Sequence, residues 1–284
     1  MADPAAAPPA PPSSSIVLEI PSSTNDIISV DLSDIFSLAL TNDDDAQQQL
    51  DDVHTLLRNE RAAVRHWVRL VEECWNHGRW RSAIDIADSA IAALAPQHYG
   101  NAAPSFIPDQ LPLLLLKATY HLSLARRAPK NLNLANNLSG QVGLTKEAQH
   151  PEFGGRMGPG PLSKEQYLFR AGKDIENAEG VAPGDPRVLD VKAAHAMLRG
   201  RLDEASKLFE RILIAEPNHL MALMGRARIL FSQRSFTPAL KTYQQVLRLR
   251  PDFLPDPRIG IGLCFWMLGD REKARRAWER SMVV

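Results

Sequence analysis

Residues 183–216 read PGDPRVLDVKAAHAMLRGRLDEASKLFERILIAE, and residues 217–250 read PNHLMALMGRARILFSQRSFTPALKTYQQVLRLR. Each stretch is 34 residues long and begins with a proline, and a third such proline, Pro251, follows them. Because proline removes an N–H donor and clashes with the preceding turn, each of these prolines marks the end of a helical unit. A period of 34 residues is typical of tetratricopeptide repeats, which are pairs of helices.

Small and large residues recur at fixed positions inside these units. An aromatic residue follows each recurring alanine by four residues, which places both on one face of a helix. These pairs are Ala205–Phe209, Ala239–Tyr243 and Ala274–Trp278. The pattern predicts that the alanine lets two helices approach while the aromatic ring fills the gap beside it. A further copy has Trp67 and Leu70 in its first helix, Gly78 in its turn, and Ala83, Ala87 and Ala90 in its second helix.

The sequence therefore predicts an all-α fold, a right-handed superhelical tetratricopeptide-repeat solenoid with a short extended segment at its N-terminus. Two helices, at 109–127 and 163–180, are expected to form one repeat that a long loop interrupts, with Ser163 and Gln166 as a capping box at the start of the second. The expected parts are a disordered Pro/Ala-rich stretch (1–15), the extended segment (16–40), a first repeat with a capping helix (46–97), the split repeat (109–183, with loop 128–162), and three further repeats (184–284), the last one incomplete.

The extended segment contains two β-branched stretches, 16–21 and 26–32, outside the helical array. A lone hairpin is marginal in water, so these stretches must dock on the repeats or be paired by a partner. Exposed strand edges invite strand addition. The residues expected to take part are Ile16, Leu18, Ile20, Ile28 and Val30.

Stacked helix pairs leave a concave surface lined by their first helices. The positions on those helices that packing does not use predict a partner-binding groove, because interfaces are enriched in aromatic residues, Met and Arg. The alternative is that some of these side chains contact the next repeat. The predicted groove residues are Arg65, Val68, Glu72, Trp75, Asn76, Arg187, Asp190, Met197, Leu198, Met221, Met224, Arg228, Phe231, Ile259, Leu263, Trp266 and Met267.

No set of residues in the sequence predicts catalysis, a metal site or a cofactor. The eight histidines have no metal-ligand spacing, and the glycine-rich stretch 154–158 lacks the ending of a phosphate loop. The two cysteines, Cys74 and Cys264, fall on apolar helix faces and are expected to be buried, inert thiols. The protein is therefore expected not to be an enzyme.

The net charge of the chain is zero but unevenly spread. Residues 1–60 carry eleven Asp/Glu against one Arg, and residues 220–284 carry twelve Lys/Arg against five Asp/Glu. Such asymmetry can mark a nucleic-acid-binding face. A basic module that binds nucleic acid or chromatin is therefore the alternative to a protein-binding scaffold, although no exposed aromatic residues interleave the basic ones in a stacking pattern.

The order of these features resembles one family. The stretch Ile16-Val17-Leu18-Glu19-Ile20-Pro21 is followed by the segment 26–32, a repeat with Trp67 and Gly78, a split repeat, and repeats that carry residues 218–227. The chain is similar to the N-terminal part of the tetratricopeptide scaffold subunit of the Paf complex, which associates with RNA polymerase II.

This resemblance implies a location in the nucleus and a role as a scaffold. The implied partner is the subunit that names the complex, with other Paf complex subunits and, indirectly, RNA polymerase II as further partners. It also implies support for transcription elongation and for histone modification. No membrane association is expected, because no run of about 18 apolar residues occurs.

Overall fold

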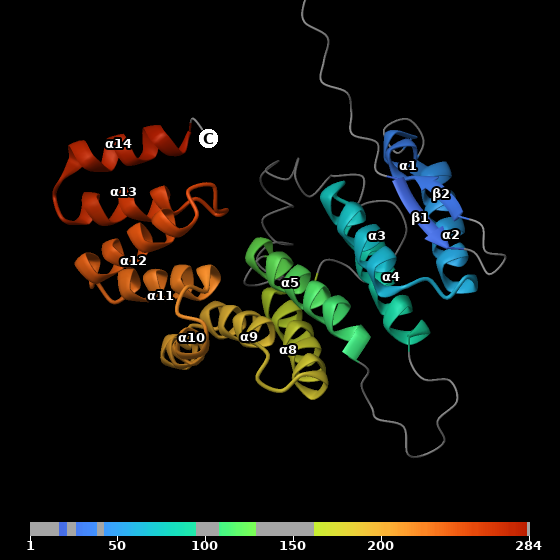
Figure 1. Cartoon of the computed structure of the whole chain (residues 1–284), viewed down its shortest axis with the longest axis horizontal. Coiled ribbons are helices and arrows are strands. Elements are labelled where there is room, and N and C mark those ends of the chain that lie inside the picture. Colours follow the sequence, from blue (N-terminus) through green and yellow to red (C-terminus); the bar gives the residue numbers. More distant parts are fainter. Residues whose placement is uncertain (1–16, 22–26, 39–42, 95–107, 129–161, 283–284) are drawn as a thin grey trace, which may run out of the picture. The chain divides into compact units, whose positions relative to one another are not determined.

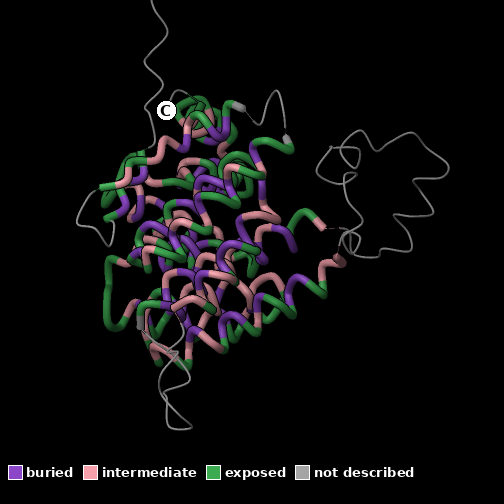
Figure 2. Tube along the Cα trace, turned by 90° about the vertical axis from the view of Figure 1, so that its right-hand side faces the viewer, coloured by how far each residue is buried: buried purple, intermediate pink, exposed green. Residues whose placement is uncertain are grey.

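The computed structural model describes residues 17–21, 27–38, 43–94, 108–128 and 162–282 (Figure 1). The chain forms two compact units, an N-terminal unit over Met1–His98 and a C-terminal unit over Tyr99–Val284. In Figure 2, buried and exposed stretches alternate along the helices, as expected for helices that bury one face. No helix among the described residues is long and apolar enough to span a membrane.

The N-terminal unit begins with a β-hairpin. Strand β1 (Val17–Pro21) pairs in antiparallel register with β2 (Ile27–Asp31), with Leu18 opposite Val30 and Ile20 opposite Ile28. Leu18 and Ile20 are fully buried, and β1 contacts helices α1 and α3 of the same unit. The hairpin therefore docks on this unit, which is one of the two outcomes that the sequence left open.

A short helix, α1 (Leu32–Leu38), follows directly after β2, where the sequence predicts only an extended segment up to residue 40. That prediction is wrong because Leu32, Ile35 and Phe36 share one helical face, and all three are buried. The Asp31 side chain accepts a hydrogen bond from the Ser33 N–H at 2.9 Å, which begins the helix.

Three longer helices complete the N-terminal unit: α2 (Asp43–Asn59), α3 (Val64–Asn76) and α4 (Trp80–Ala93). The α3–α4 turn contains Gly78 in the left-handed region at φ +80°. Trp67 is buried, and so are the three alanines predicted for the second helix. A polar contact joins α2 to α4, since Ser82 Oγ donates to Gln47 Oε1 at 3.1 Å. The predicted first repeat and its acidic capping helix thus have the expected helices.

The C-terminal unit consists of a 3-10 turn, η1 (Pro108–Gln110), and eight helices among its described residues. Helix α8 begins with the predicted capping box, because Ser163 and Gln166 satisfy each other's backbone N–H groups. Helices α5 and α8 pack against each other, and the predicted loop between them falls almost wholly outside the described residues. The helices are α5 (Leu111–Arg127), α8 (Lys164–Val181), α9 (Pro186–Leu198), α10 (Leu202–Ala215), α11 (Leu220–Ser232), α12 (Phe236–Leu249), α13 (Pro257–Met267) and α14 (Arg271–Ser281).

Helices α9 to α14 form successive pairs whose packing follows the period in the sequence. The recurring alanines are fully buried, and Phe209 and Tyr243 each lie against a glycine of the next helix pair. A Cβ atom at Gly225 would lie 2.2 Å from the Phe209 ring, and one at Gly260 would lie 2.5 Å from the Tyr243 ring. Each aromatic ring therefore occupies the space that a missing side chain leaves on the following helix.

Trp278, the third aromatic residue of this series, packs differently. It lies against Gly262 of its own pair and remains half-buried, and its indole Nε1–H donates to the Ile259 carbonyl oxygen at 3.3 Å. The sequence predicts equal roles for the three aromatics, so this residue departs from the expectation.

Candidate protein-interaction surface

One face of α13 is apolar and exposed. Ile259, Leu263, Trp266 and Met267, here called the α13 stripe, are spaced by four, three and one residues along the helix. Their exposed fractions lie between 43% and 52%. This spacing places them on a single helical face, since residues three and four apart are neighbours. Contiguous exposed apolar residues of this kind mark protein interaction sites.

The opposite face of α13 anchors the stripe. Gly260, Ile261 and Cys264 are buried against the neighbouring helices. The Asp256 carboxylate accepts the Arg258 N–H at 2.9 Å and so caps the helix. The guanidinium of Arg271 lies over the Trp266 ring, 5.2 Å from its centre, which orients the ring by a cation–π contact. The stripe is therefore held on a rigid helix.

Helix α11 precedes α13 as the first helix of its pair. Met221 and Arg228 are exposed, and Phe231 is half-buried with its ring edge against Phe236. Met224 is only 7% exposed and belongs to the core with Leu223 and Ala227. The prediction that Met224 lines the groove is therefore wrong: its position points toward the next helix pair, the alternative considered from the sequence.

Helix α9 carries a half-buried acidic contact. His219, at the start of α11, accepts the Ala222 N–H through Nδ1 at 3.3 Å and points Nε2 toward Asp190 Oδ2 at 3.5 Å. Burial raises the pKa of Asp190 to about 6, with His219 opposing and Glu216 adding to the shift. The other predicted groove residues of α9 are exposed Arg187, which pairs with Asp185 at 2.8 Å, and half-buried Met197 and Leu198.

The predicted groove residues of α3 belong to the N-terminal unit. Arg65 and Asn76 are exposed, while Val68, Glu72 and Trp75 are half-buried. These residues share one helix of the N-terminal unit. A groove that continues from α3 to α13 stays a prediction.

The predicted strand-pairing residues divide into two groups. Leu18 and Ile20 of β1 are buried inside their own unit, and the pairing of their strand with a partner stays a prediction. Ile28 and Val30 of β2 are half-buried. Ile16 lies outside the described residues.

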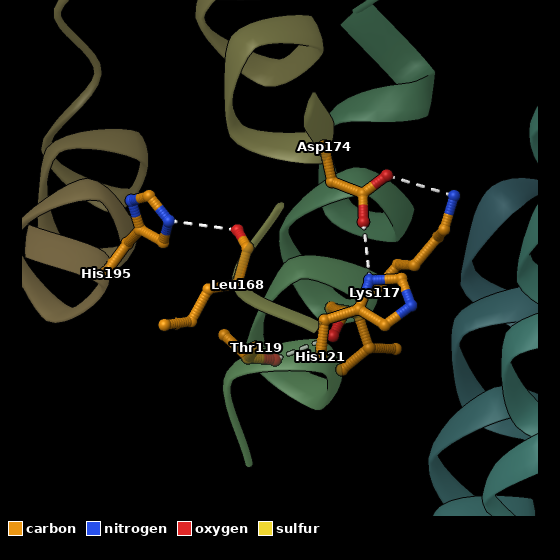
Figure 3. Close-up of polar contacts among 7 residues, drawn as sticks. Lys117, Thr119, His121, Leu168, Asp174 and His195 are labelled. Atoms are coloured by element: carbon orange, nitrogen blue, oxygen red, sulfur yellow. Dashed lines mark hydrogen bonds and ion pairs between the residues drawn. The ribbon is translucent and has the colours of Figure 1, made fainter. Parts of the chain in front are cut away.

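A buried polar cluster joins α5 and α8 (Figure 3). Asp174 accepts from Lys117 Nζ at 3.0 Å and lies 2.8 Å from His121 Nδ1. His121 and Asp174 are almost fully buried, and His121 Nε2 has no hydrogen-bond partner among the described residues. A second contact in Figure 3 joins His195 Nε2 of α9 to the Leu168 carbonyl oxygen of α8 at 3.0 Å. The cluster holds two helices that are far apart in sequence.

This cluster was not predicted. His121 and Lys117 lie within a long, mainly apolar helix, α5. Nothing in their spacing identifies Asp174, which follows His121 by 53 residues, as their partner. A polar residue at a core position of a helix was the only available signal.

The described residues offer little for catalysis. Burial raises the pKa of the Cys74 thiol to about 12 and that of Cys264 to about 11, so both are protonated at neutral pH. Both are buried, as predicted. No group of three potential metal ligands occurs among the residues that the structure describes.

Three of the basic residues of α14 contact nearby acidic or aromatic side chains. Lys273 pairs with Asp270 at 2.7 Å, Arg275 lies within 3.6 Å of Glu272 and Glu279, and Arg271 lies on Trp266. Arg276 and Arg280 are exposed. These pairings reduce the positive potential that nucleic-acid binding requires.

Comparison with known proteins agrees with the fold and with the resemblance found in the sequence. Residues 192–252 match the tetratricopeptide repeat family. The chain is 28% identical over 246 residues to the RNA polymerase-associated protein CTR9 of Saccharomyces cerevisiae, covering 81% of this chain and 19% of that protein. It is 21% identical over 239 residues to the protein CTR9 homolog of Arabidopsis thaliana, covering 84% of this chain and 19% of the relative.

The chain thus spans about a fifth of the length of these curated relatives. The homology confirms the resemblance to a tetratricopeptide scaffold subunit. Among solved structures, a thermophilic tetratricopeptide-repeat protein of Thermus thermophilus superposes with a TM-score of 0.51 at 12% identity, over 78% of this chain and 90% of that one. This likeness concerns the fold alone, and it confirms the helical repeat architecture.

Proposed function

We propose that this chain is a protein-binding scaffold segment of a nuclear complex that associates with RNA polymerase II. The observation that carries the proposal is the α13 stripe, four exposed apolar side chains on one face of α13. The helix is capped at its N-terminus, and its opposite face is buried. The homology to an RNA polymerase-associated protein supports the type of complex. The partner is another subunit of that complex, and transcription elongation and histone modification are the processes it would serve.

The mode of binding follows from the chemistry of the stripe. Desolvating aromatic and aliphatic side chains supplies most of the free energy of a protein interface, and a few such residues dominate. Ile259, Leu263 and Met267 offer this area, and the exposed Arg228 on α11 offers a positive charge to an acidic residue of the partner. A partner segment with apolar residues at helical or extended spacing fits this face. The scaffold requires no catalytic group of its own.

The test is affinity capture from nuclear extract with matched variants. Ile259→Ser, Leu263→Ser and Met267→Ser are combined in one variant. The control combines Ile214→Ser, Leu249→Ser and Met282→Ser, which are apolar residues exposed elsewhere on the same unit. We expect the wild type and the control to capture RNA polymerase II-associated proteins, identified by mass spectrometry, and the stripe variant to lose about nine-tenths of them. Equal capture by both variants at equal helicity contradicts the proposal.

Nucleic-acid binding is the competing function, and the same samples distinguish it. If the captured material is nucleic acid, nuclease treatment releases it and its yield falls steeply with salt. The internal pairing of the α14 charges favours the protein-binding function instead.

A further inference from the structure

Among the described residues, the outer edge of strand β2 has no partner strand. Strand β2 (Ile27–Asp31) pairs with β1 on one side, and no backbone group of β2 bonds to any other described residue. In an antiparallel pair, alternate residues point their N–H and C=O groups away from the partner strand. These groups form a row of unpaired donors and acceptors, which is the template that an added strand uses.

The apolar layer under the hairpin is incomplete on the same side. Leu18 and Ile20 of β1 are 2% and 0% exposed. Their cross-strand neighbours Val30 and Ile28 are only half-buried. The apolar side chains on this face of the hairpin are therefore fully buried at β1 but only partly covered at β2. A neighbouring strand would bury these two side chains, since residues on one face of adjacent strands pack against each other.

The sequence that contains and follows this strand, up to the end of α2, is acidic. Between β1 and the end of α2 the described residues include a single basic side chain, Arg58. The acidic residues in the same range are Glu19, Asp31, Asp34, Asp44, Asp45, Asp51 and Asp52. On the outer face of β2, Ile27 is 67% exposed and Ser29 is exposed, with Asp31 at the end of the strand.

We propose that the open edge of β2 receives an extended segment of a partner protein in which apolar residues alternate with lysine or arginine. The apolar residues lie beside Ile28 and Val30 on the inner face, and the basic residues lie on the outer face beside Ser29 and Asp31. The proposal rests on the function as a protein-binding scaffold, and it identifies a second contact that is separate from the α13 stripe. It also accounts for a hairpin of only two strands, which a third strand stabilises.

The experiment uses the full chain and a synthetic probe, a peptide of about eight residues in which valine and lysine alternate, a length typical of strands. Binding is followed by fluorescence anisotropy, and amide hydrogen exchange locates the site. We expect exchange at 27–31 to slow about ten-fold or more at saturation while exchange in α13 is unchanged. A valine–glutamate peptide is expected to bind at least about ten-fold more weakly. Two further probes carry N-methyl groups on alternate residues, one on the odd and one on the even positions. Only every second N–H faces β2, so one of these probes should lose binding and the other should keep it.

Variants of the strand complete the test. Ile28→Thr with Val30→Thr keeps β-branched residues and removes apolar area, and it should weaken binding by about five-fold or more. Val17→Thr on the exposed face of β1 is the matched control and should change binding less than about two-fold. Three results overturn the inference: no binding, equal binding of the two peptides, or insensitivity to backbone methylation. If the peptide fails to bind at β2 while the α13 stripe variant still loses its captured proteins, the scaffold proposal stands and the contact at β2 is rejected.

Discussion

Two parts of the C-terminal unit hold their helices together by opposite means. Where α10 to α13 follow one another through short turns, aromatic rings lie in spaces left by glycines, as with Phe209 at Gly225. Where a long loop separates α5 from α8, the contact instead contains a buried carboxylate, Asp174, between Lys117 and His121. The periodic contacts repeat and can be found from sequence spacing. The polar contact occurs once and specifies one pairing of two distant helices.

The largest expected effect breaks the polar contact. Asp174→Ala removes the buried carboxylate that pairs with Lys117, whose side chain is 15% exposed. Removing one member of a buried ion pair destabilises by about 3–5 kcal/mol, and the partial exposure of Lys117 places this case near 3 kcal/mol. Urea unfolding measures the change. Asp203→Ala on the exposed side of α10 is the control, with an expected change of less than about 0.5 kcal/mol.

A second variant shows whether this contact stabilises the folded state or only specifies the pairing of α5 with α8. Replacing Lys117, His121 and Asp174 together by Met, Leu and Leu should leave stability nearly unchanged or increase it, because apolar residues avoid the desolvation of the charges. A triple variant as unstable as Asp174→Ala would contradict a role in specificity and indicate net stabilisation by the charges.

The next effect concerns the periodic contacts. Gly225→Ala puts a Cβ 2.2 Å from Phe209, and the expected loss is about 1–3 kcal/mol from overpacking. Gly172→Ala in α8 is the matched control, because its Cβ would lie 3.6 Å from His195 at ordinary contact distance. That change should stabilise by about 0.5–1 kcal/mol, since alanine favours helix over glycine. Equal changes in stability for Gly225→Ala and Gly172→Ala would show that the close contact between glycine and an aromatic ring is not special to the periodic part.

A pH dependence tests the contact between Asp190 and His219 inside the periodic part. The folded pKa of Asp190 is about 6, above its ordinary value near 3.8. The folded state therefore holds the proton more tightly than the unfolded state, and stability falls as the pH rises from about 4 to about 6. The difference between the folded and the ordinary pKa corresponds to a loss of up to about 3 kcal/mol, which urea titrations across this range measure. Asp190→Asn should lack it, and an identical pH profile in this variant would assign the loss to other groups.

The smallest effect concerns the turns. Gly200 and Gly269 adopt φ +78° and +88°, and Arg234 occupies the equivalent turn at φ +60°. Arg234→Gly relieves the strain of a side chain in the left-handed region and should stabilise by about 0.5–1 kcal/mol, whereas Gly200→Ala should destabilise by about 1 kcal/mol. Thermal unfolding of the two variants measures both changes. If both variants shift the unfolding temperature in the same direction, the two turns are not equivalent.

Sequence reasoning recovered the features that repeat or obey local rules. The period of 34 residues, the capping box at Ser163 and the buried alanines all follow from spacing and backbone chemistry. Sequence reasoning missed α1, because that helix has only three buried apolar residues. The carboxylate that caps it belongs to Asp31, which is also the last residue of strand β2. The same reasoning placed Met224 on the surface because periodicity defines a face of a helix but not which neighbour covers it.

The central claim is that the α13 stripe contacts a protein, and site-specific photo-crosslinking tests it most directly. A photoreactive phenylalanine replaces Leu263, 43% exposed in the stripe, or Ile214, 82% exposed on α10. Irradiation in nuclear extract, followed by mass spectrometry, identifies what each position touches. We expect position 263 to crosslink one dominant RNA polymerase II-associated protein and position 214 to give none. Nucleic acid as the adduct at 263, or the same adducts at both positions, would contradict the account.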